Sequence, residues 1–228
     1  MSKTQTPGPP LTARLVGPLL RFFFRLLYHE LAWSYDLVAA AVSLGLWQRW
    51  VYAVLPYLSG PRVLELGHGP GHLQAALAHR EVFAAGLDES RQMGRQALAR
   101  LARLDYPRRL VNGYAQRLPF PAGSFHQVAA TFPSDYIVQP AALAEIHRVL
   151  QPGGSLVVLP FAWHTGQGAL QRLAAGLFRI TGEAPEWDQA FLEPFRRAGF
   201  QPRLEWHTLR QSRLVILLAR KPETGRAG

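Results

Sequence analysis

The sequence predicts an α/β protein with a doubly wound, mostly parallel sheet of seven strands that ends in an antiparallel hairpin. From Pro61 onward, short apolar runs alternate with helix-like segments, which is typical of a parallel sheet covered by helices on both faces. A stretch with three glycines in five residues, 67–71, stands between the first apolar run and a helix-like run. No helix-like segment separates the last two apolar runs, so we expect them to form the hairpin.

Each expected element rests on its apolar pattern and on the turn residues that flank it. Strands are expected at 62–66, 82–87, 109–111, 127–132, 155–161, 202–209 and 212–220. Helices are expected from about His72 and at 90–104, 140–150 and 187–200. These elements define a domain over residues 60–221, in which residues 161–185 are expected to be a helical insertion.

Three further segments are expected outside this domain. Residues 1–10 and 222–228 contain many Pro, Gly and polar residues, which indicates flexible tails. Residues 11–59 contain many aromatic residues among leucines, and this pattern predicts an N-terminal helical cap.

Arg14, Arg21 and Arg25 of the cap would share one face of a continuous helix. Such a face suits peripheral contact with an anionic membrane. Alternatively, it is the solvated side of a helix that packs over a substrate pocket. The sequence leaves both interpretations open.

Composition narrows the class of protein further. A chain of 228 residues is long enough for one domain with a full core. Because it contains no cysteine, disulfides, thiolate metal sites and cysteine nucleophiles are excluded. The absence of cysteine favours a cytoplasmic protein. In addition, no apolar run reaches the roughly 18 residues of a membrane span. The net charge of +10 suits an anionic membrane surface, nucleic acid, or merely a solvated basic face.

The glycine-rich stretch predicts a ligand that approaches the backbone at the start of a helix. Gly67, Gly69 and Gly71 follow the first strand, but a dinucleotide-binding pattern would place its third glycine at His72. Glu65 stands two residues before the first glycine. A carboxylate there suits an ammonium-bearing ligand better than a pyrophosphate, which it would repel.

This stretch resembles the class I S-adenosylmethionine-dependent methyltransferases, specifically the type 11 group. The family pattern D/E-x-G-x-G-x-G matches residues 65–71, and the second strand ends in "GLDES". Two further family motifs are similar to "NGYAQRLPFPAGSFHQV" and "LAEIHRVLQPGGSLVVL", in the same order and spacing. The resemblance covers residues 61–159 well, and it implies a Rossmann-like fold with S-adenosyl-L-methionine as cofactor.

The resemblance also implies roles for single residues. Asp88 would accept from the ribose hydroxyls, and Tyr35 would close over the methionine end unless it is an ordinary core residue. Tyr114 replaces the family's adenine-binding aspartate, so adenine recognition would rest on Ala115 and Leu118. His68, at a position that is often small, is expected to pack. The implied cofactor site consists of Glu65, Gly67, Gly69, Gly71, Asp88, Ala115, Leu118, Thr131 and Tyr35.

Methyl transfer requires alignment and exclusion of water, but no particular catalytic side chain. If the acceptor must lose a proton, a base is expected on the loop after the fourth strand, where Asp135 and Tyr136 are candidates. An aspartate before a helix is, however, commonly a cap or turn residue. Trp163 and His164 follow the fifth strand and are candidates for lining the acceptor pocket. The scattered histidines predict no metal site.

The leading interpretation is therefore methyl transfer from S-adenosyl-L-methionine to a small-molecule or lipid-like acceptor. The apolar cap favours an apolar acceptor. One alternative is a non-catalytic methyltransferase-like binding or regulatory module, which Tyr114 and the lack of a clear base keep open. Another is an RNA methyltransferase, which rests on the net charge alone, so nucleic acid is not the expected partner.

Overall fold

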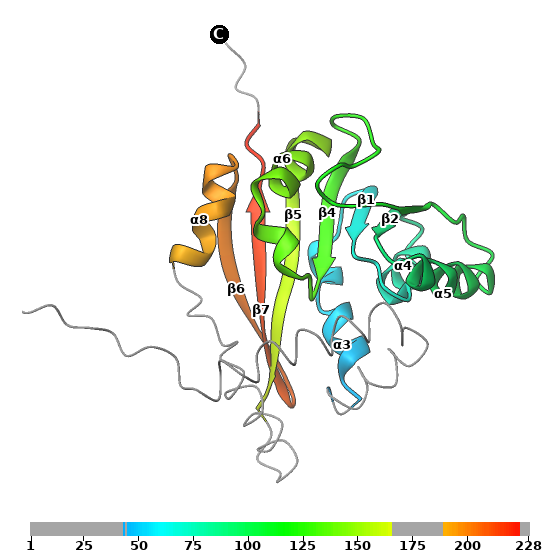
Figure 1. The fold of residues 1–228 in the computed structure, drawn as a ribbon. Helices are drawn as coiled ribbons and strands as arrows, with labels where there is room; N and C mark the ends of the chain where they lie inside the picture. Colours follow the sequence, from blue (N-terminus) through cyan, green and yellow to red (C-terminus); the bar gives the residue numbers. More distant parts are fainter. Residues whose placement is uncertain (1–42, 44, 166–188, 224–228) are drawn as a thin grey trace, which may run out of the picture.

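The computed structural model describes residues 43, 45–165 and 189–223, and it confirms the predicted fold class (Figure 1). A seven-stranded sheet has the order β3-β2-β1-β4-β5-β7-β6. The strands are β1 (Arg62–Leu66), β2 (Phe83–Asp88), β3 (Leu110–Asn112), β4 (Phe125–Thr131), β5 (Leu150–His164), β6 (Gln201–Leu209) and β7 (Ser212–Arg220).

Strand direction determines which edge of the sheet can hold a ligand. The strands from β3 to β5 run parallel, whereas β7 is antiparallel to both of its neighbours, β5 and β6. The chain builds outward from β1 to β3 on one side and continues with β4 on the other side. Open sheets of this kind bind ligands at the carboxyl ends of the strands, beside this reversal. The glycine stretch after β1 lies at that edge.

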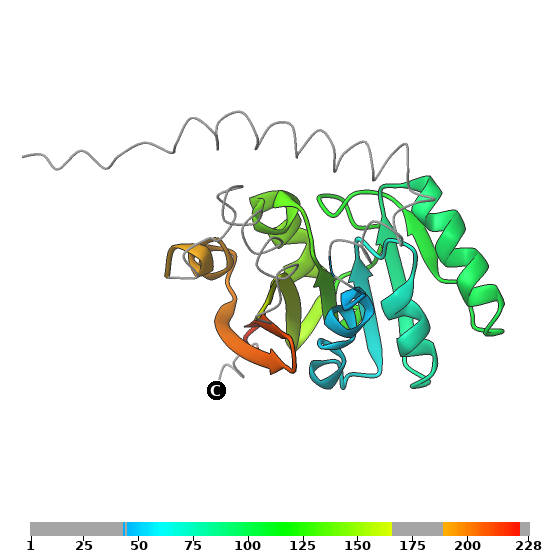
Figure 2. The same cartoon turned by 90° about the horizontal axis from the view of Figure 1, so that it is seen from below.

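Helices cover both faces of the sheet, as Figure 2 shows. On one face, α6 (Pro140–Val149) and α8 (Gln189–Arg197) pack over a buried core that includes Leu64 and Leu66 of β1. On the other face, α3 (Trp47–Tyr52) and α4 (His72–Ala78) cover Val63. Alternate residues of β1 are thus buried on opposite faces, as expected of a parallel strand.

The remaining helical elements are short or lie toward the β3 edge. Helix α5 (Arg91–Ala102) packs beside α4 and contacts β2 and β3. It begins after Ser90, whose hydroxyl accepts a hydrogen bond of 3.3 Å from the Met93 N–H and so caps the helix. Two 3₁₀ turns are also present: η2 (Leu55–Tyr57) precedes β1, and η3 (Asp135–Val138) precedes α6. No helix in the described part of the chain is long and apolar enough to span a membrane.

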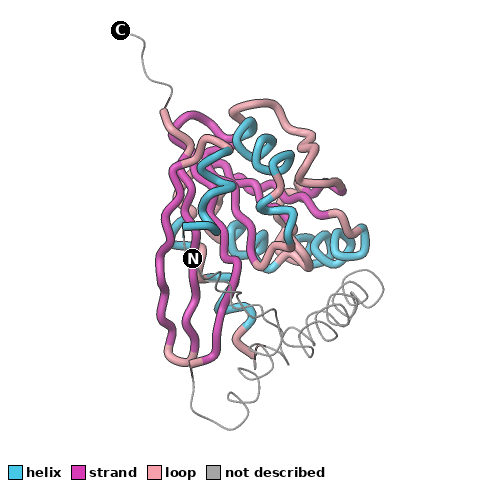
Figure 3. Tube along the Cα trace, turned by 60° about the vertical axis from the view of Figure 1, so that its left-hand side comes forward, coloured by secondary structure: helices cyan, strands magenta, loops and turns pink. Residues whose placement is uncertain are grey.

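The β5–β7–β6 ribbon extends beyond the carboxyl end of β4. Thr131 at that end pairs with Leu159, but β5 continues to His164, which lies opposite Ser212 of β7. Figure 3 shows these three long strands side by side. Residues 161–164, expected in the insertion, are therefore strand, because β7 supplies backbone hydrogen-bond partners where β4 has ended.

Several sequence-based expectations fall on residues outside the described ranges. These include residues 1–42, with Tyr35 and the three arginines of the cap, and residues 166–185 of the insertion. At the C-terminal end, the expected tail begins in contact with the sheet, because the Gly153 N–H donates to the Pro222 carbonyl at 3.4 Å.

Candidate functional site

The glycine loop, residues 67–71, turns the chain from β1 into α4. Gly69 has a φ of 52°, and a Cβ atom there would meet no heavy atom within 4 Å. The space above this residue is thus open, and a side chain would fill it. Gly71 serves packing instead: it has a φ of 83°, and a Cβ there would lie 2.8 Å from Ala97 Cβ of α5. A backbone with positive φ and open space above it suits a ligand that meets the main chain.

Asp88 holds the loop from the neighbouring strand. Its carboxylate accepts hydrogen bonds of 2.8 Å from the backbone N–H groups of Gly69 and Ser90. The side chain is only 2% exposed. A carboxylate can accept several hydrogen bonds, so this bracing is chemically compatible with the ribose contact that the sequence predicts. The predicted ribose contact stays a prediction, whereas the bracing of the loop is a role that sequence reasoning missed.

Glu65 is a buried residue of β1, two positions before the loop. It is 1% exposed, and its Oε2 accepts a hydrogen bond of 2.8 Å from Gln74 Nε2 on α4. Burial, with a further contribution from nearby Asp88, raises the pKa of this carboxyl to about 8. The group is therefore largely protonated at neutral pH in the absence of a nearby cation. Its predicted attraction for an ammonium group stays a prediction.

His68 packs inside the loop, as expected from the sequence. It is 4% exposed, and its Nδ1 lies 2.7 Å from the Gly69 carbonyl oxygen. Burial is the main effect on its pKa and lowers it, which favours a neutral ring with Nδ1–H as the donor. Its ring edge lies 3.0 Å from the position that a Cβ would take on Gly86. His68 thus fills the space between the loop and β2.

Of the two candidate bases, the structure brings Tyr136 to the loop. Its hydroxyl donates to the Leu66 carbonyl at 3.2 Å and lies 3.2 Å from the position that a Cβ would take on Gly67. Burial, followed by the charges of Asp88 and Glu65, raises the pKa of this phenol above its usual value. Tyr136 is thus a hydrogen-bond donor rather than a base at neutral pH. Asp135 begins η3 and is exposed.

The predicted adenine-contacting residues belong to the core. Ala115 and Leu118 are 6% and 4% exposed, whereas Tyr114 is 63% exposed. The Leu118 N–H donates to Glu145 Oε2 at 2.7 Å. Thr131, at the end of β4, is half-buried.

A pair of charged residues on α6 holds this segment. Arg148 donates to the carbonyls of Leu118 and Phe120 at 3.0 and 2.8 Å, and it also pairs with Glu145 at 2.7 Å. The Arg148 guanidinium lowers the pKa of Glu145. The signal in the sequence is that an acidic and a basic residue, Glu145 and Arg148, stand three positions apart in an expected helix, which places their side chains side by side.

Aromatic side chains gather at the carboxyl ends of β4 and β5. Phe132, with a φ of 49°, stacks on Trp47 of α3 at 4.5 Å between ring centroids. Trp50 of α3 packs against His164 at 5.0 Å. Trp163 lies instead against Trp206 at 5.7 Å. Because successive strand residues point to opposite faces, Trp163 and His164 do not line the same side of the ribbon.

Comparisons with known proteins agree with this geometry. A family model described as a methyltransferase domain matches residues 63–154, which include the glycine loop, Asp88 and Tyr136. The chain is 36% identical over 140 residues to the demethylmenaquinone methyltransferase of Beutenbergia cavernae, a match that covers 60% of this chain and 57% of the relative. The matched region thus spans just over half of that curated relative.

Two solved structures share the fold. A phosphoethanolamine N-methyltransferase 2 of Haemonchus contortus, in complex with S-adenosylhomocysteine, superposes with a TM-score of 0.58 at 18% identity, covering 78% of this chain and 53% of that chain. The [4+2]-cyclase SpnF superposes with a TM-score of 0.58 at 19% identity, covering 97% and 100%. Such low identities show the fold alone. The match of residues 63–154 to a methyltransferase domain, together with the named relative, supports the resemblance of this chain to the class I S-adenosylmethionine-dependent methyltransferases of the type 11 group.

Proposed function

We propose that this chain binds S-adenosyl-L-methionine over the glycine loop and catalyses methyl transfer to an apolar, lipid-like small molecule. The observation that carries the proposal is the open space at the Cβ position of Gly69. The loop around it is held by the buried Asp88 carboxylate, and the Tyr136 hydroxyl lies beside Gly67. A Cβ atom at Gly69 would fill this space, so the loop fits a ligand that meets its backbone.

The residues around the loop suggest how the cofactor lies. Asp88 would receive the ribose hydroxyls, and Ala115 with Leu118 would contact the adenine. The methionine end would then lie toward Leu66 and Tyr136. An ammonium group near Glu65 would favour the charged form of that carboxyl and so lower its raised pKa.

The cofactor supplies a methyl group on a sulfonium, which a nucleophile displaces in line. The chain's contribution is to align the acceptor and exclude water. The Tyr136 phenol remains protonated at neutral pH because of its raised pKa. It therefore positions groups by donating a hydrogen bond, and the acceptor must attack without losing a proton to this residue.

Two observations support an apolar acceptor. The aromatic residues Trp47 and Phe132 stack beside the carboxyl end of β4 and suit contact with a planar, apolar molecule. The relative from Beutenbergia cavernae is named for demethylmenaquinone, a lipid-like quinone. We therefore take demethylmenaquinone as the first acceptor to test.

The decisive experiment is calorimetric titration with S-adenosylhomocysteine, followed by transfer of labelled methyl from S-adenosyl-L-methionine. We expect saturable cofactor binding and label in demethylmenaquinone or another apolar lipid of a cell extract. A bulk transfer RNA sample should receive no label. Absence of any S-adenosylhomocysteine binding would refute the proposed cofactor site.

A second candidate function is a binding module or an enzyme that does not transfer methyl groups. The exposed Tyr114, in place of the expected aspartate, favours it. The structural likeness to a [4+2]-cyclase means that proteins with this fold include one that is not named a methyltransferase. Cofactor binding without methyl transfer to any extract component would support this second candidate.

A further inference from the structure

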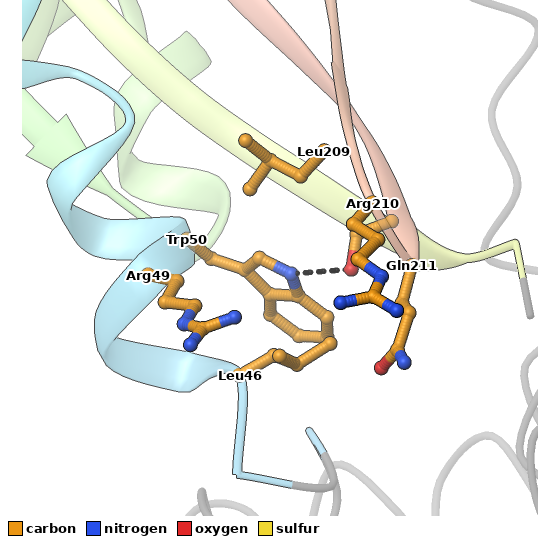
Figure 4. A pocket seen from close by; sticks show the side chains of 7 residues that line it. Leu46, Arg49, Trp50, Leu209, Arg210 and Gln211 are labelled. Atoms are coloured by element: carbon orange, nitrogen blue, oxygen red, sulfur yellow. Dashed lines mark hydrogen bonds between the residues drawn. The ribbon is translucent and has the colours of Figure 1, made fainter.

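A cavity of about 100 Å³ lies between α3 and the β6–β7 turn (Figure 4), and none of the residues that line it belongs to the glycine loop. Its apolar walls are the side chains of Leu46, Trp50 and Leu209. Its polar lining comes from Arg49, Arg210, Gln211 and Ser212. The cavity thus joins two segments that are far apart in the sequence, and it combines an apolar floor with two cationic side chains.

The arginines of this cavity have no counter-charge among the described residues. Neither Arg49 nor Arg210 forms an ion pair or a side-chain hydrogen bond in that part of the chain, and no acidic residue lines the cavity. Figure 4 shows both guanidinium groups near the Trp50 indole, one from each side of the cavity. Two like charges that line one cavity repel each other, so an anion bound in the cavity would relieve this repulsion.

A hydrogen bond holds the Trp50 indole, which forms part of the apolar lining of the cavity, in place. Trp50 Nε1 donates a hydrogen bond of 2.8 Å to the hydroxyl oxygen of Ser212, and both residues are buried, at 5% and 1% exposure. This bond links α3 to β7 and fixes the indole that forms the cavity floor. The Ser212 hydroxyl accepts this bond with its oxygen, so its own proton can be donated to a ligand.

The chemistry of the lining indicates which anion fits. Guanidinium groups are planar forks of donors that match the oxygens of a phosphate, and the Gln211 amide adds a further donor. About 10–15 Å³ of such cavity space is enough for one water molecule, so the cavity has room for a group of several heavy atoms such as a phosphate.

We propose that Arg49, Arg210, Gln211 and Ser212 form a binding site for a phosphate group, either free phosphate or the headgroup of an anionic phospholipid. The site is separate from the glycine loop and does not depend on the proposed methyl transfer. An apolar floor beside the arginines strengthens their attraction for the anion, because nearby low-dielectric surface reduces screening by water.

The first test is calorimetric titration of the full chain with inorganic phosphate. We expect saturable binding of one phosphate per chain, weakened about tenfold or more when Arg49→Gln and Arg210→Gln are combined, since hydrogen bonds to charged groups are lost. Both arginines are exposed, so the double variant should fold normally, which a thermal melt checks. The matched control combines Arg103→Gln with Arg108→Gln, two exposed arginines outside the cavity.

The control has the same change in net charge, so the two double variants separate a local site from the overall charge of +10. An equal loss of phosphate binding in both variants would overturn the proposal, as would no saturable binding in the unchanged chain. Binding to vesicles of phosphatidylglycerol and phosphatidylcholine distinguishes the sources. Vesicle binding that only the cavity variant loses, and that phosphate inhibits, identifies a lipid headgroup. Phosphate binding without such vesicle binding identifies a soluble phosphate.

Discussion

The backbone N–H of Gly69 donates a hydrogen bond of 2.8 Å to the buried carboxylate of Asp88, so the glycine loop and the end of β2 form one structural unit. If the predicted ribose contact holds, a single carboxylate would bind the ribose and also hold the loop over which the cofactor would lie. Substitutions on either side of this bond test the site directly.

Replacing the carboxylate in Asp88→Ala should weaken S-adenosylhomocysteine binding by about 1.5–3 kcal/mol, the range for hydrogen bonds to a charged group. The variant should also melt at a lower temperature, because the Gly69 N–H loses its acceptor. Calorimetry measures the affinity, and Glu89→Ala is the control because it removes a carboxylate from the exposed neighbouring position. An unchanged affinity in Asp88→Ala would mean that the ribose lies elsewhere.

The variant Gly69→Val should abolish cofactor binding and still fold. A side chain would occupy the open space above the loop, and the positive φ costs a non-glycine residue about 1–2 kcal/mol. The matched control is Gly123→Val, because Gly123 also has a positive φ, of 64°, and open space at its Cβ position. It should lose similar stability without loss of affinity. Retained binding in a folded Gly69→Val variant would contradict the assignment of the loop.

Stability should depend on pH through Glu65. Burial raises the pKa of its carboxyl from 4.5 to about 8, so the folded state binds this proton more tightly than the unfolded state. The contribution is fully present below about pH 4.5, and it is lost progressively as the pH rises from there to about 8. Over this window, the free energy of unfolding should decrease by a few kcal/mol, at roughly 1.4 kcal/mol per pKa unit.

The variant Glu65→Gln keeps an oxygen that can accept from Gln74 but does not titrate. Its free energy of unfolding should therefore lack this component, and its advantage over the unchanged chain should grow from pH 5 to pH 8. Urea unfolding without cofactor at several pH values measures the difference. Parallel curves for the two proteins would show that Glu65 has no raised pKa.

The variant Tyr136→Phe should reduce methyl transfer by about tenfold at most, the effect of losing one ordinary hydrogen bond. Since the raised pKa keeps this phenol protonated, the dependence of the transfer rate on pH should keep its shape between pH 6 and pH 9. Initial rates with labelled S-adenosyl-L-methionine measure both quantities. A rising limb that disappears in the variant would instead identify Tyr136 as a base.

Local pattern in the sequence was sufficient for the order of elements and for the loop. The alternation of apolar runs with helix-like segments predicts the parallel sheet, and the three glycines after the first strand predict the turn at its carboxyl end. These features depend on neighbours in the chain. A turn that requires glycine, a strand and an amphipathic helix can each be predicted from the residue pattern of a short stretch of sequence.

The tertiary structure alone decided which side chains meet, because burial and strand pairing depend on residues that are distant in the chain. Glu65 has a raised pKa because helix α4 and strand β2 bury it, and nothing in "RVLELG" specifies that environment. Trp50 meets Ser212 only because β5, β7 and β6 extend past β4 toward α3. This extension also makes Trp163 and His164 successive residues of β5. Their side chains therefore point to opposite faces, although the sequence alone had grouped them at one site.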